Sequence, residues 1–550
     1  FLPIVKGLDD EVVQKYNREF EETNITKADQ PKFVGLHWRE DQRRSYPQQS
    51  IGAHIVGMSS DDGVGQAGIE QSQNELLYGP VVKKIQERDR FGRVYDEVLS
   101  EQEPPSDVTL TIDLPVQFIA EQALEGAVER TGARSAMAVV IDNKTGEILA
   151  MANYPTFDPN KIGNTNPEFI KNGIVQNVYS PGSVFKLITY GAALEKKLIT
   201  PEAEIDSGSG VIDVAGHVFR DSHAVGRVSY AKALAQSSNV CAIKTSMRVG
   251  REDFNGLVHK MGFGKPTGIE LPAETGGIVR PIQRWNGDSL ASMSIGYEIG
   301  VTALQMASAF ATIANDGVRI EPHIIKEIRR ADGTSAPIGE HPKTEIVSRE
   351  TARDLKRMLT EVVISGTGKR AQLDSYSSAG KTGTAWKFDP QTKRINSSKY
   401  VSSFIGFAPA NDPRVTIAVV VDEPKFGGRH GGSAAAPAFK EIADRILPEL
   451  NVAPDKEIVA AVSESRDDSV PEVPSGGVTI EKSELLNRSA SKIAAGTPAT
   501  PPKNSSQKLK KNPPSSNETR KARENKPEGI ARSATATSGV KERKSAAKKT

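Results

Sequence analysis

Ser183 and Lys186 are the two residues of this chain whose types and spacing most directly suggest chemistry. They lie three positions apart, a spacing that places both side chains on one face of a helix. A serine hydroxyl becomes a good nucleophile when a base removes its proton, and a neutral lysine amine one helical turn away is such a base. Ser180 as N-cap and Pro181 at the first helical position predict that this helix begins just before Ser183.

The same placement predicts a site for negative charge at the backbone of Ser183. The first N–H groups of a helix have no partner within the helix, so the amide of Ser183 is free to donate to a developing oxyanion. The helix dipole also favours negative charge at this end. The chemistry expected here is therefore acyl transfer through a serine ester.

Two further motifs follow downstream, Ser237-Ser238-Asn239 and Lys381-Thr382-Gly383-Thr384. A serine three residues before a lysine occurs often by chance, but these three motifs in this order form the signature of the serine acyl-enzymes of the penicillin-binding and β-lactamase group. Lys144-Thr145-Gly146 matches part of the third motif but precedes the serine. It lies between two apolar runs and is predicted to be a hairpin turn.

Composition limits the classes of protein and site that are possible, but it does not indicate a function. The chain has 550 residues, 37% of them hydrophobic, and a net charge of +2. The last fifty residues hold fourteen Lys or Arg and four Asp or Glu, so the remainder carries about −8. The only cysteine, Cys241, excludes an intrachain disulfide and is predicted to be a buried packing residue. No His-Glu-x-x-His occurs and no metal site is expected.

One glycine-rich segment, residues 366–369 (Gly-Thr-Gly-Lys), resembles part of a phosphate-binding loop. Arg370 stands where that motif has Ser or Thr, and Val363 stands where it has its first Gly. The segment is therefore interpreted as an ordinary loop. The sequence also has no run of 18 apolar residues and no signal peptide.

The pattern of elements predicts an α/β (α+β) protein with three regions, 1–106, 107–450 and 451–550. Strands are predicted at 108–112, 136–141, 147–151, 381–386, 403–407 and 415–421, and helices at 113–127 and 434–447. Strand pairs at both ends of the middle region, around a mainly helical centre, predict one antiparallel sheet covered by helices. Residues 451–550 contain no Phe, Trp or Tyr, which predicts a disordered basic tail.

Beyond the three motifs, the chain resembles a class B penicillin-binding protein, a monofunctional peptidoglycan D,D-transpeptidase, over residues 35–447. The division-associated branch is favoured. Matching segments occur at 43–47, 53–57, 68–70, 145–155, 262–264, 268–272, 301–305 and 404–410. The resemblance implies a pedestal domain at 1–106 and a β-lactamase/transpeptidase-like domain at 107–450. In one departure, many family members have an acidic residue where Ser180 stands.

The resemblance also implies a role for each motif residue. Ser183 attacks the D-Ala-D-Ala carbonyl of a stem peptide, and Lys186 takes its proton after burial and a neighbouring cation, Lys381, have lowered its pKa. Ser237 relays a proton to the leaving D-alanine, and Asn239 holds the substrate amide and orients Lys186. The other expectations concern substrate and oxyanion binding: Lys381, Thr382, Gly383 and Thr384 bind the terminal carboxylate, and the amides of Ser183 and Thr384 form the oxyanion hole. No cofactor is expected.

The partners implied are lipid II-derived peptidoglycan stem peptides, β-lactam antibiotics, a membrane glycosyltransferase and other proteins of the division machinery. Nucleic acid is not expected as a partner. The resemblance, together with a first residue other than Met, predicts a single N-terminal membrane anchor upstream of Phe1 and a periplasmic or extracytoplasmic catalytic domain. The basic tail is expected either to bind anionic wall polymers or lipid headgroups weakly or to have no partner.

Two rival functions remain open on the sequence. A carboxypeptidase or β-lactamase would transfer the acyl group to water, and a penicillin sensor would keep the site without turning over. The acyl-enzyme lifetime and a cross-linking assay distinguish these alternatives. Trp386, next to the third motif, is expected either to line the substrate groove or to pack in the interior.

Overall fold

The computed structural model describes residues 8, 10–26, 44–78, 84–88, 90, 94–98, 105–337, 341–389 and 394–456. Most of the predicted tail therefore lies outside the described residues. Within the ranges just given, no helix combines the length and apolar character needed to cross a membrane.

A five-stranded antiparallel sheet forms the centre of the catalytic region. Its order is β18 (Ala379–Asp389), β19 (Arg394–Ala408), β20 (Val415–Asp422), β6 (Ser135–Asp142) and β7 (Ile148–Tyr154). The two ends of the region meet where β20 pairs with β6, with Val415 opposite Asp142. This is the arrangement that the sequence predicts. The turn between β6 and β7 contains Gly146 at φ +82°, which supports the interpretation of residues 144–146 as a hairpin turn.

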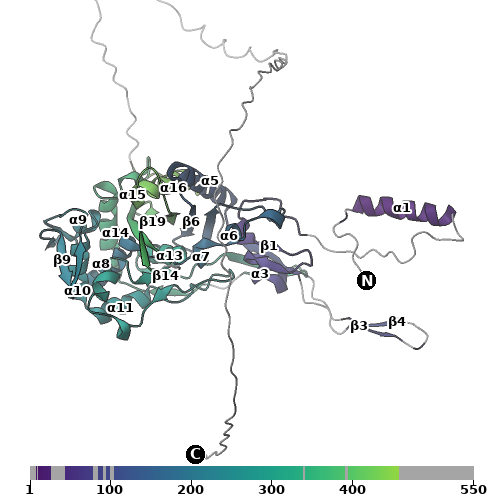
Figure 1. The fold of residues 1–550 in the computed structure, drawn as a ribbon, viewed down its shortest axis with the longest axis horizontal. Helices are drawn as coiled ribbons and strands as arrows, with labels where there is room; N and C mark the ends of the chain where they lie inside the picture. The colour runs from purple at the N-terminus through teal and green to yellow at the C-terminus, as the bar shows by residue number, and fades with distance from the viewer. Residues whose placement is uncertain are drawn as a thin grey trace, which may run out of the picture. The chain divides into compact units, whose positions relative to one another are not determined.

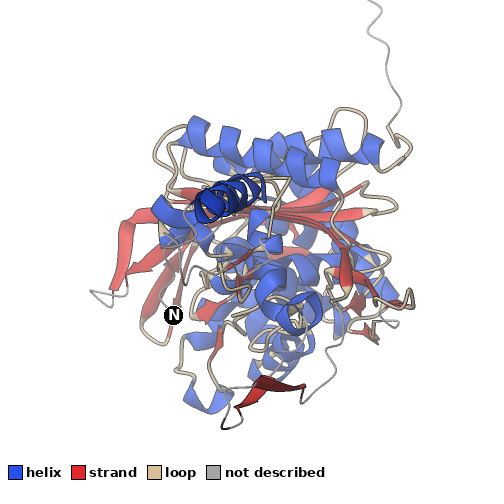
Figure 2. Cartoon of the chain, turned by 90° about the vertical axis from the view of Figure 1, so that its right-hand side faces the viewer, coloured by secondary structure: helices blue, strands red, loops and turns tan. Residues whose placement is uncertain are grey.

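Alternating side chains of the sheet enter two separate cores. Val140 of β6 and Val419 of β20 pack with α5 (Leu114–Thr131) and α16 (Ala436–Glu449) on one face. Their neighbours Val139 and Val420 pack into the larger core on the other face. Figures 1 and 2 show the two long helices on one side of the sheet and a mainly helical layer on the other.

The larger core contains the helices that carry the first two motifs. It is built around α13 (Ala303–Ala314), which is buried along almost its whole length. The other helices of this layer are α7 (Gly173–Gln176), α8 (Lys186–Glu195), α9 (Tyr230–Ala235), α10 (Asn239–Val249), α11 (Arg251–Lys260), α12 (Ser289–Ser294) and α14 (Arg349–Ile364). Short strands join them: β8 (Glu204–Asp206), β9 (Val211–Val214), β10 (His217–Arg220), β11 (Arg227–Ser229), β12 (Ile278–Val279), β13 (Ile299–Gly300), β14 (Val318–Ile320) and β17 (Lys343–Glu345). The short α6 (Pro167–Ile170) has no buried residue.

The two edges of the main sheet differ. At β7, the buried side chain of Gln117 from α5 accepts from Met151 N (2.8 Å) and donates to Met151 O (3.2 Å), so it replaces a neighbouring strand. At the other edge, β18 is paired with β19 on one side only. The open edge is the one that carries the third motif, which leaves backbone groups there for an extended ligand.

The N-terminal region consists of small elements, consistent with the predicted α+β pedestal. They are α1 (Asp10–Thr26), α2 (Ala53–Val56), β1 (Met58–Ser59), β2 (Gly65–Ala67), α3 (Gly68–Ser72), α4 (Asn74–Tyr78), β3 (Lys84–Arg88) and β4 (Val94–Val98). Residues 44–57 bond to the catalytic region: Tyr46 N donates to Asn160 (3.0 Å) and Gly52 N to Glu121 (2.9 Å). A second sheet of β5 (Asp107–Leu110), β15 (Ile325–Arg329) and β16 (Ser335–Pro337) follows.

Two predicted boundaries near the C-terminus need correction. The closing helix expected at 434–447 is α16 (Ala436–Glu449), preceded by the separate turn α15 (Gly431–Ala434), and Ala435, with φ −101° and ψ −37°, lies between them. The predicted tail also begins too early. Tyr376 Oη donates to Val452 O (3.0 Å), and Asp455 accepts from Ser377 N (2.6 Å), so residues 451–456 pack on the catalytic region.

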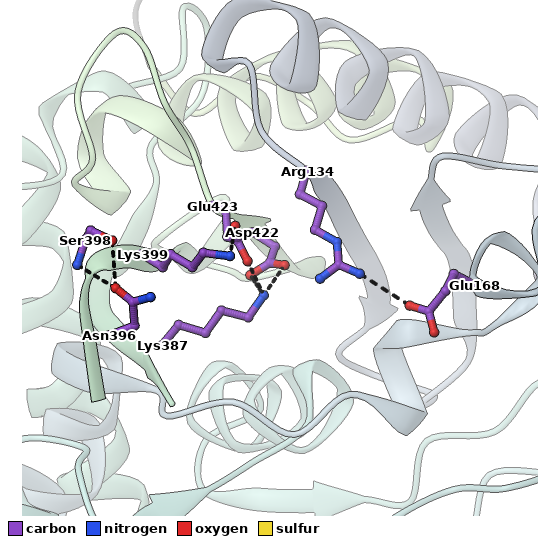
Figure 3. Close-up of polar contacts among 8 residues, drawn as sticks. All are labelled: Arg134, Glu168, Lys387, Asn396, Ser398, Lys399, Asp422 and Glu423. Carbon is purple, nitrogen blue, oxygen red and sulfur yellow. Dashed lines mark hydrogen bonds and ion pairs between the residues drawn. The ribbon is translucent and has the colours of Figure 1, made fainter. Parts of the chain in front are cut away.

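A group of four charged side chains, here called the charged clamp, ties together the far ends of β18, β19 and β20. Lys387 Nζ of β18 donates to both carboxylate oxygens of Asp422 (2.9 and 2.6 Å) and to Glu423 (2.9 Å), and Lys399 pairs with Glu423 at 3.0 Å. Figure 3 shows this group together with the separate Arg134–Glu168 ion pair. Although burial opposes the shift, the hydrogen bonds from both lysines lower the pKa of Glu423.

Candidate active site

Ser183 lies in a tight 3₁₀ turn, Gly182–Phe185, that leads directly into α8. The predicted start of this helix is wrong: the N-cap is Pro181 rather than Ser180, and no side chain caps the turn. The physical reason is Gly182. It has φ +56°, and its N–H donates to Gly296 O (3.1 Å), so the chain turns sharply one residue before the serine.

That turn brings Ser183 next to the third motif. A Cβ atom on Gly182 would lie 2.8 Å from the carbonyl oxygen of Thr384, so the turn and β18 are in direct contact. Ser183 itself is half-buried, whereas Val184 and Phe185 are fully buried beside it. The serine is therefore held at the boundary between the helical core and the open edge of the sheet.

Lys186 is completely buried, and its Nζ donates to residues of the second motif. It donates to Ser237 O (2.6 Å), Asn239 Oδ1 (2.8 Å) and Ser237 Oγ (3.3 Å). Burial lowers the pKa of Lys186 to about 7, while the carboxylate of Asp221 acts in the opposite direction. A substantial fraction of this lysine is then neutral at pH 7 and able to accept a proton.

Ser237 adopts a left-handed backbone, φ +60°, at the C-terminal end of α9. Its N–H donates to Leu234 O and that of Ser238 to Ala233 O, both at 3.0 Å, which is the Schellman arrangement that usually has glycine at this position. A serine there costs on the order of 1 kcal/mol. The turn presents both the carbonyl and the hydroxyl of Ser237 to Lys186, so the strained backbone serves the site.

Asn239 begins α10, and its side chain joins two parts of the site. Its Oδ1 accepts from Lys186, and its Nδ2 donates to Arg220 O at 2.9 Å. The N-cap of α10 is Ser238, whose Oγ accepts from Cys241 N at 3.0 Å. The middle residue of the motif therefore holds the helix, which leaves the side chains on either side of it for the lysines.

Lys381 is the second completely buried lysine. Its Nζ donates to Ser237 Oγ (3.0 Å), Thr382 O (3.1 Å) and Thr382 Oγ1 (3.3 Å). Burial and the nearby charge of Lys186 lower its pKa well below the ordinary value. Two lysines that donate to one hydroxyl without a directly bonded carboxylate disfavour double protonation, so the pair titrates as a unit.

The remaining third-motif residues line the wall of the site. Gly383 leaves no room for a side chain, because a Cβ would lie 2.3 Å from Ser403 Oγ and 2.8 Å from Pro181 O. Thr384 is half-buried, and its Oγ1 accepts from Gly431 N at 3.1 Å. Trp386 is 44% exposed and lies 6.1 Å from the ring of Tyr297, so it is a surface aromatic beside the site rather than a core residue.

Five of the predicted site residues are linked by hydrogen bonds: Lys186, Ser237, Asn239, Lys381 and Thr382. Ser183 lies next to Gly182, whose backbone contacts β18 at Thr384. Cys241 is fully buried, as predicted. Across the described part of the chain, no group of three or more His, Cys, Asp or Glu side chains is arranged to hold a metal ion.

Asp221 is a site residue that sequence reasoning missed. It follows β10, and its carboxylate accepts from the backbone N–H groups of Asn239 and Val240, the latter at 3.0 Å, and from Ser238 Oγ at 2.7 Å. It thus binds the N-terminal turn of α10, where negative charge is favourable. No motif marks an aspartate sixteen positions before Ser237, so its role becomes visible only when the β9–β10 hairpin is placed.

Comparison with known proteins agrees with this site. Residues 136–444 match the penicillin binding protein transpeptidase domain, and residues 6–110 match the penicillin-binding protein dimerisation domain. The chain is 37% identical over 442 residues to penicillin-binding protein PbpB of Mycolicibacterium smegmatis, covering 78% of this chain and 68% of that protein. It is 32% identical over 426 residues to peptidoglycan D,D-transpeptidase FtsI of Escherichia coli, covering 77% and 70%.

A solved structure shows the same fold. Penicillin binding protein 3 of Mycobacterium tuberculosis in complex with aztreonam aligns with a TM-score of 0.69 and 33% identity, over 75% of this chain and 92% of that one. The family models and the relatives cover both the pedestal and the catalytic region. This chain belongs to the penicillin-binding protein transpeptidase family, as a class B penicillin-binding protein of the division type.

Proposed function

We infer that this protein is a peptidoglycan D,D-transpeptidase that cross-links stem peptides during cell division, with Ser183 as its acylated residue. The observation that carries the assignment of Ser183 is the position of Ser237 Oγ. It lies 3.3 Å from Lys186 Nζ and 3.0 Å from Lys381 Nζ, and within the described residues the acceptors of both lysines are hydroxyl, carbonyl and amide oxygens. This arrangement favours proton transfer between an amine and a hydroxyl beside the turn that bears Ser183.

In the first half-reaction, the oxygen of Ser183 attacks the carbonyl of the penultimate D-alanine while its proton passes to neutral Lys186. The tetrahedral intermediate then collapses, the C–N bond breaks, and the leaving D-alanine takes a proton from Lys186 through Ser237. The contacts of Ser237 with both lysines support this relay. The products are an acyl-enzyme ester and free D-alanine.

In the second half-reaction, the amine of another stem peptide attacks the ester. Lys186 accepts the proton of the attacking amine, and Ser183 leaves with a proton returned through the same relay. The new amide bond is the cross-link. Because each half-reaction returns Lys186 to its neutral form, the pKa of about 7 suits both directions of proton transfer.

The wall formed by β18 binds the donor peptide as an added strand along the open edge of the sheet. The backbone N–H groups of Ser183 and Thr384 stabilise the oxyanion, each at roughly 3 kcal/mol of barrier. Lys381 provides positive potential, and Thr382 and Thr384 provide hydroxyls for the terminal carboxylate. β-Lactams acylate the same serine because they present a reactive carbonyl and a carboxylate at comparable positions.

The substrates place this activity outside the cytoplasmic membrane, with a membrane glycosyltransferase and other division proteins as partners. The regions 1–106, 107–450 and 451–550 act as pedestal, catalytic domain and tail, with the correction that residues 451–456 belong to the catalytic domain. The relatives named above support the family to which these roles belong.

Labelled penicillin tests the assignment. The wild-type protein is expected to be labelled once, on the peptide that contains Ser183, and Ser183→Ala is expected to abolish labelling. Labelling that persists in this variant contradicts the role of Ser183. Cross-linking of purified peptidoglycan substrate then distinguishes a transpeptidase from a sensor, and an acyl-enzyme lifetime of minutes or less indicates a β-lactamase.

A further inference from the structure

The turn that bears Ser183 rests on residues 296–301, here called the support segment. Gly182 N donates to Gly296 O at 3.1 Å. A Cβ on Gly296 would lie 2.1 Å from Gly182 O, so the two backbones are in direct contact. At its other end the support segment exchanges two N–H···O bonds of 3.0 Å with Tyr179. The position of the serine turn therefore depends on the backbone path of the support segment.

Glu298, in the middle of the support segment, has a left-handed backbone with φ +56°. Glycine adopts this conformation easily, whereas a residue with a Cβ is disfavoured in it. A strained residue of this kind persists only where the surrounding structure holds it in place. The contacts of its side chain show what holds it.

The carboxylate of Glu298 is bound from the neighbouring strand. β12 and β13 pair with Val279 opposite Ile299, so the next position of the register places Arg280 opposite Glu298. Arg280 Nη2 donates to Glu298 Oε2, and Ser289 Oγ donates to the same oxygen at 2.9 Å. Arg280 Nη2 also donates to Ser289 Oγ at 2.8 Å. These three side chains form a closed network that fixes the middle of the support segment.

The network lies two residues from the contact with the serine turn. Glu298 is held by Arg280, and Gly296 is in contact with Gly182, which directly precedes Ser183. An amide stabilises an oxyanion only when it is placed within hydrogen-bond distance of the position where the charge develops. A displacement of about 1 Å at a reacting group can cost a factor of about 100 in rate. The support segment is therefore able to control acylation without touching the substrate.

We propose that Glu298 is a positioning residue for acylation. Its ion pair with Arg280 holds the support segment in its left-handed path, and this path keeps Gly182 and the amide of Ser183 where the oxyanion forms. This role rests on the proposed function, because it concerns the oxyanion site of the same serine.

The test measures two quantities with labelled penicillin, the limiting rate of acylation and the dissociation constant of the complex that precedes it. Glu298→Gln keeps the size of the side chain and removes its charge. Because the oxyanion forms only in the transition state, the limiting rate is expected to fall about tenfold, part of the roughly 10²–10³-fold that loss of a whole oxyanion donor costs. The dissociation constant is expected to stay within about twofold. A change in the dissociation constant alone assigns Glu298 to binding and overturns the proposal.

Variants of Arg280 test whether the carboxylate acts through the ion pair. Arg280→Gln is expected to lower the limiting rate as much as Glu298→Gln does. The double variant is expected to lose no more than either single variant, because the two residues act as a unit. Arg280→Lys keeps the charge and is expected to keep most of the rate. Losses that multiply in the double variant overturn the proposal.

Glu298→Gly separates the side chain from the backbone. Glycine adopts the left-handed conformation without strain, so the variant allows the same backbone path but lacks the carboxylate. Its limiting rate is expected to be as low as that of Glu298→Gln. A wild-type rate in Glu298→Gly would show that the backbone path needs no carboxylate, which overturns the proposal.

Asp107→Asn is the matched control. Asp107 stands opposite Arg329 in the second sheet, in another cross-strand ion pair of an arginine and a carboxylate, with an N–O distance of 2.5 Å. No motif residue lies in that sheet, so the limiting rate is expected to stay within about twofold. An equal loss in Asp107→Asn and Glu298→Gln overturns the proposal, as does a wild-type rate in Glu298→Gln. If Glu298→Gln does not fold by circular dichroism, Arg280→Gln decides by the same criteria.

The proposed function has its own separate readout. If the wild-type protein is not acylated at Ser183, the transpeptidase assignment fails together with this inference. If the wild type is acylated at Ser183 with the same limiting rate as Glu298→Gln, only the inference fails.

Discussion

β18 carries two lysines, six residues apart, whose burial and hydrogen-bond partners differ. Lys381 is completely buried and donates to a hydroxyl, a carbonyl and a second hydroxyl, with no carboxylate among these partners. Lys387, in the charged clamp, is partly exposed and donates to Asp422 and Glu423. One strand therefore holds one cation whose charge is disfavoured and another whose charge is fully compensated.

The difference in pairing distinguishes a lysine that stabilises the fold from a lysine that can transfer a proton. Compensated charges, as in the charged clamp, join the strands. Uncompensated lysines such as Lys381 and Lys186 have lowered pKa values, and this makes proton transfer near neutral pH possible. The same property makes them costly to fold, because the protein must desolvate an amine without pairing it.

The largest expected effect comes from removing the amine at Lys186. Lys186→Met is expected to reduce the rate of acylation by labelled penicillin at least about 10⁴-fold, because nucleophile and base act as a unit. Lys387→Met changes a lysine of the charged clamp in the same way and is the matched control. Its acylation rate is expected to stay within about threefold, less than the tenfold that corresponds to 1.4 kcal/mol. Similar losses in both variants would show that any lysine near the sheet supports acylation through structure alone.

A smaller effect is expected from Asp221, the carboxylate whose charge acts on Lys186. The groups that face Lys186 are Ser237, Asn239, Cys241, Lys381 and the charge of Asp221, and among them Asp221 raises the pKa of Lys186. Since neutral Lys186 is the base, the acylation rate rises with pH through about 7. Asp221→Asn removes the opposing charge, so this rise is expected to move to lower pH.

The same variant also loosens the turn that holds Asn239, so the maximal rate is expected to fall about tenfold to 100-fold, the range for a hydrogen bond that involves a charged group. The pH profile of acylation is the measurement that separates the two effects. A lower rate with the rise unmoved would assign Asp221 a purely structural role. A rise displaced to higher pH would contradict the electrostatic argument.

Much of the catalytic core was predictable because short patterns determine it. The apolar runs at residues 136–141 and 415–421 predicted the central strands, and three motifs in order predicted the lysines and Ser237. The turn at Ser183 was not predictable in detail. Ser180 and Pro181 have the sequence of a helix start, but the contact of Gly182 with Gly296 O, more than a hundred residues later, decides the backbone there.

The residues that sequence reasoning missed share one property. Asp221 and Thr367 both contact a motif from a separate element, through hydrogen bonds to Ser238 and Thr382. Neither has a characteristic spacing to the motif that it supports, because the spacing depends on a hairpin and a loop between them. A sequence motif identifies residues that act together on one helix or strand. It does not identify residues that contact the motif from another element of the fold.

The comparison between the two lysines of β18 also predicts opposite changes in stability. Lys381 has a folded-state pKa well below its unfolded value, so the unfolded chain binds more protons at neutral pH and the lysine destabilises the fold there. Lys381→Met is expected to raise the free energy of unfolding at pH 7 by about 2 kcal/mol. This gain should shrink as pH rises toward the unfolded value of about 10.4. Lys387→Met is expected to lower it by about 1 kcal/mol, because it leaves two carboxylates without their shared cation.

Urea unfolding at pH 7 and pH 9 measures both changes. The sign is the decisive quantity: stabilisation by both variants would show that the charged clamp does not hold the strands. Destabilisation by both would show that Lys381 contributes packing that outweighs the cost of its buried amine. A gain for Lys381→Met that does not depend on pH would remove protonation as its cause.

The smallest effects are expected at the C-terminus. Two truncations there separate the contribution of the basic tail from that of residues 451–456. The last fifty residues carry a surplus of ten positive charges. The described residues end at Lys456, whose Nζ donates to Leu373 O at 2.7 Å. Truncation after Lys456 is expected to leave acylation unchanged and the free energy of unfolding within about 0.5 kcal/mol.

Truncation after Leu450 also removes Val452 and Asp455, which bond to Tyr376 and Ser377, and is expected to cost about 1 kcal/mol. Thermal unfolding of the two truncated proteins beside the full chain tests this. If removing the tail after Lys456 lowers the free energy of unfolding more than the further removal of residues 451–456 does, the basic tail stabilises the catalytic region. The positive charges of this protein would then affect its stability outside the active site as well.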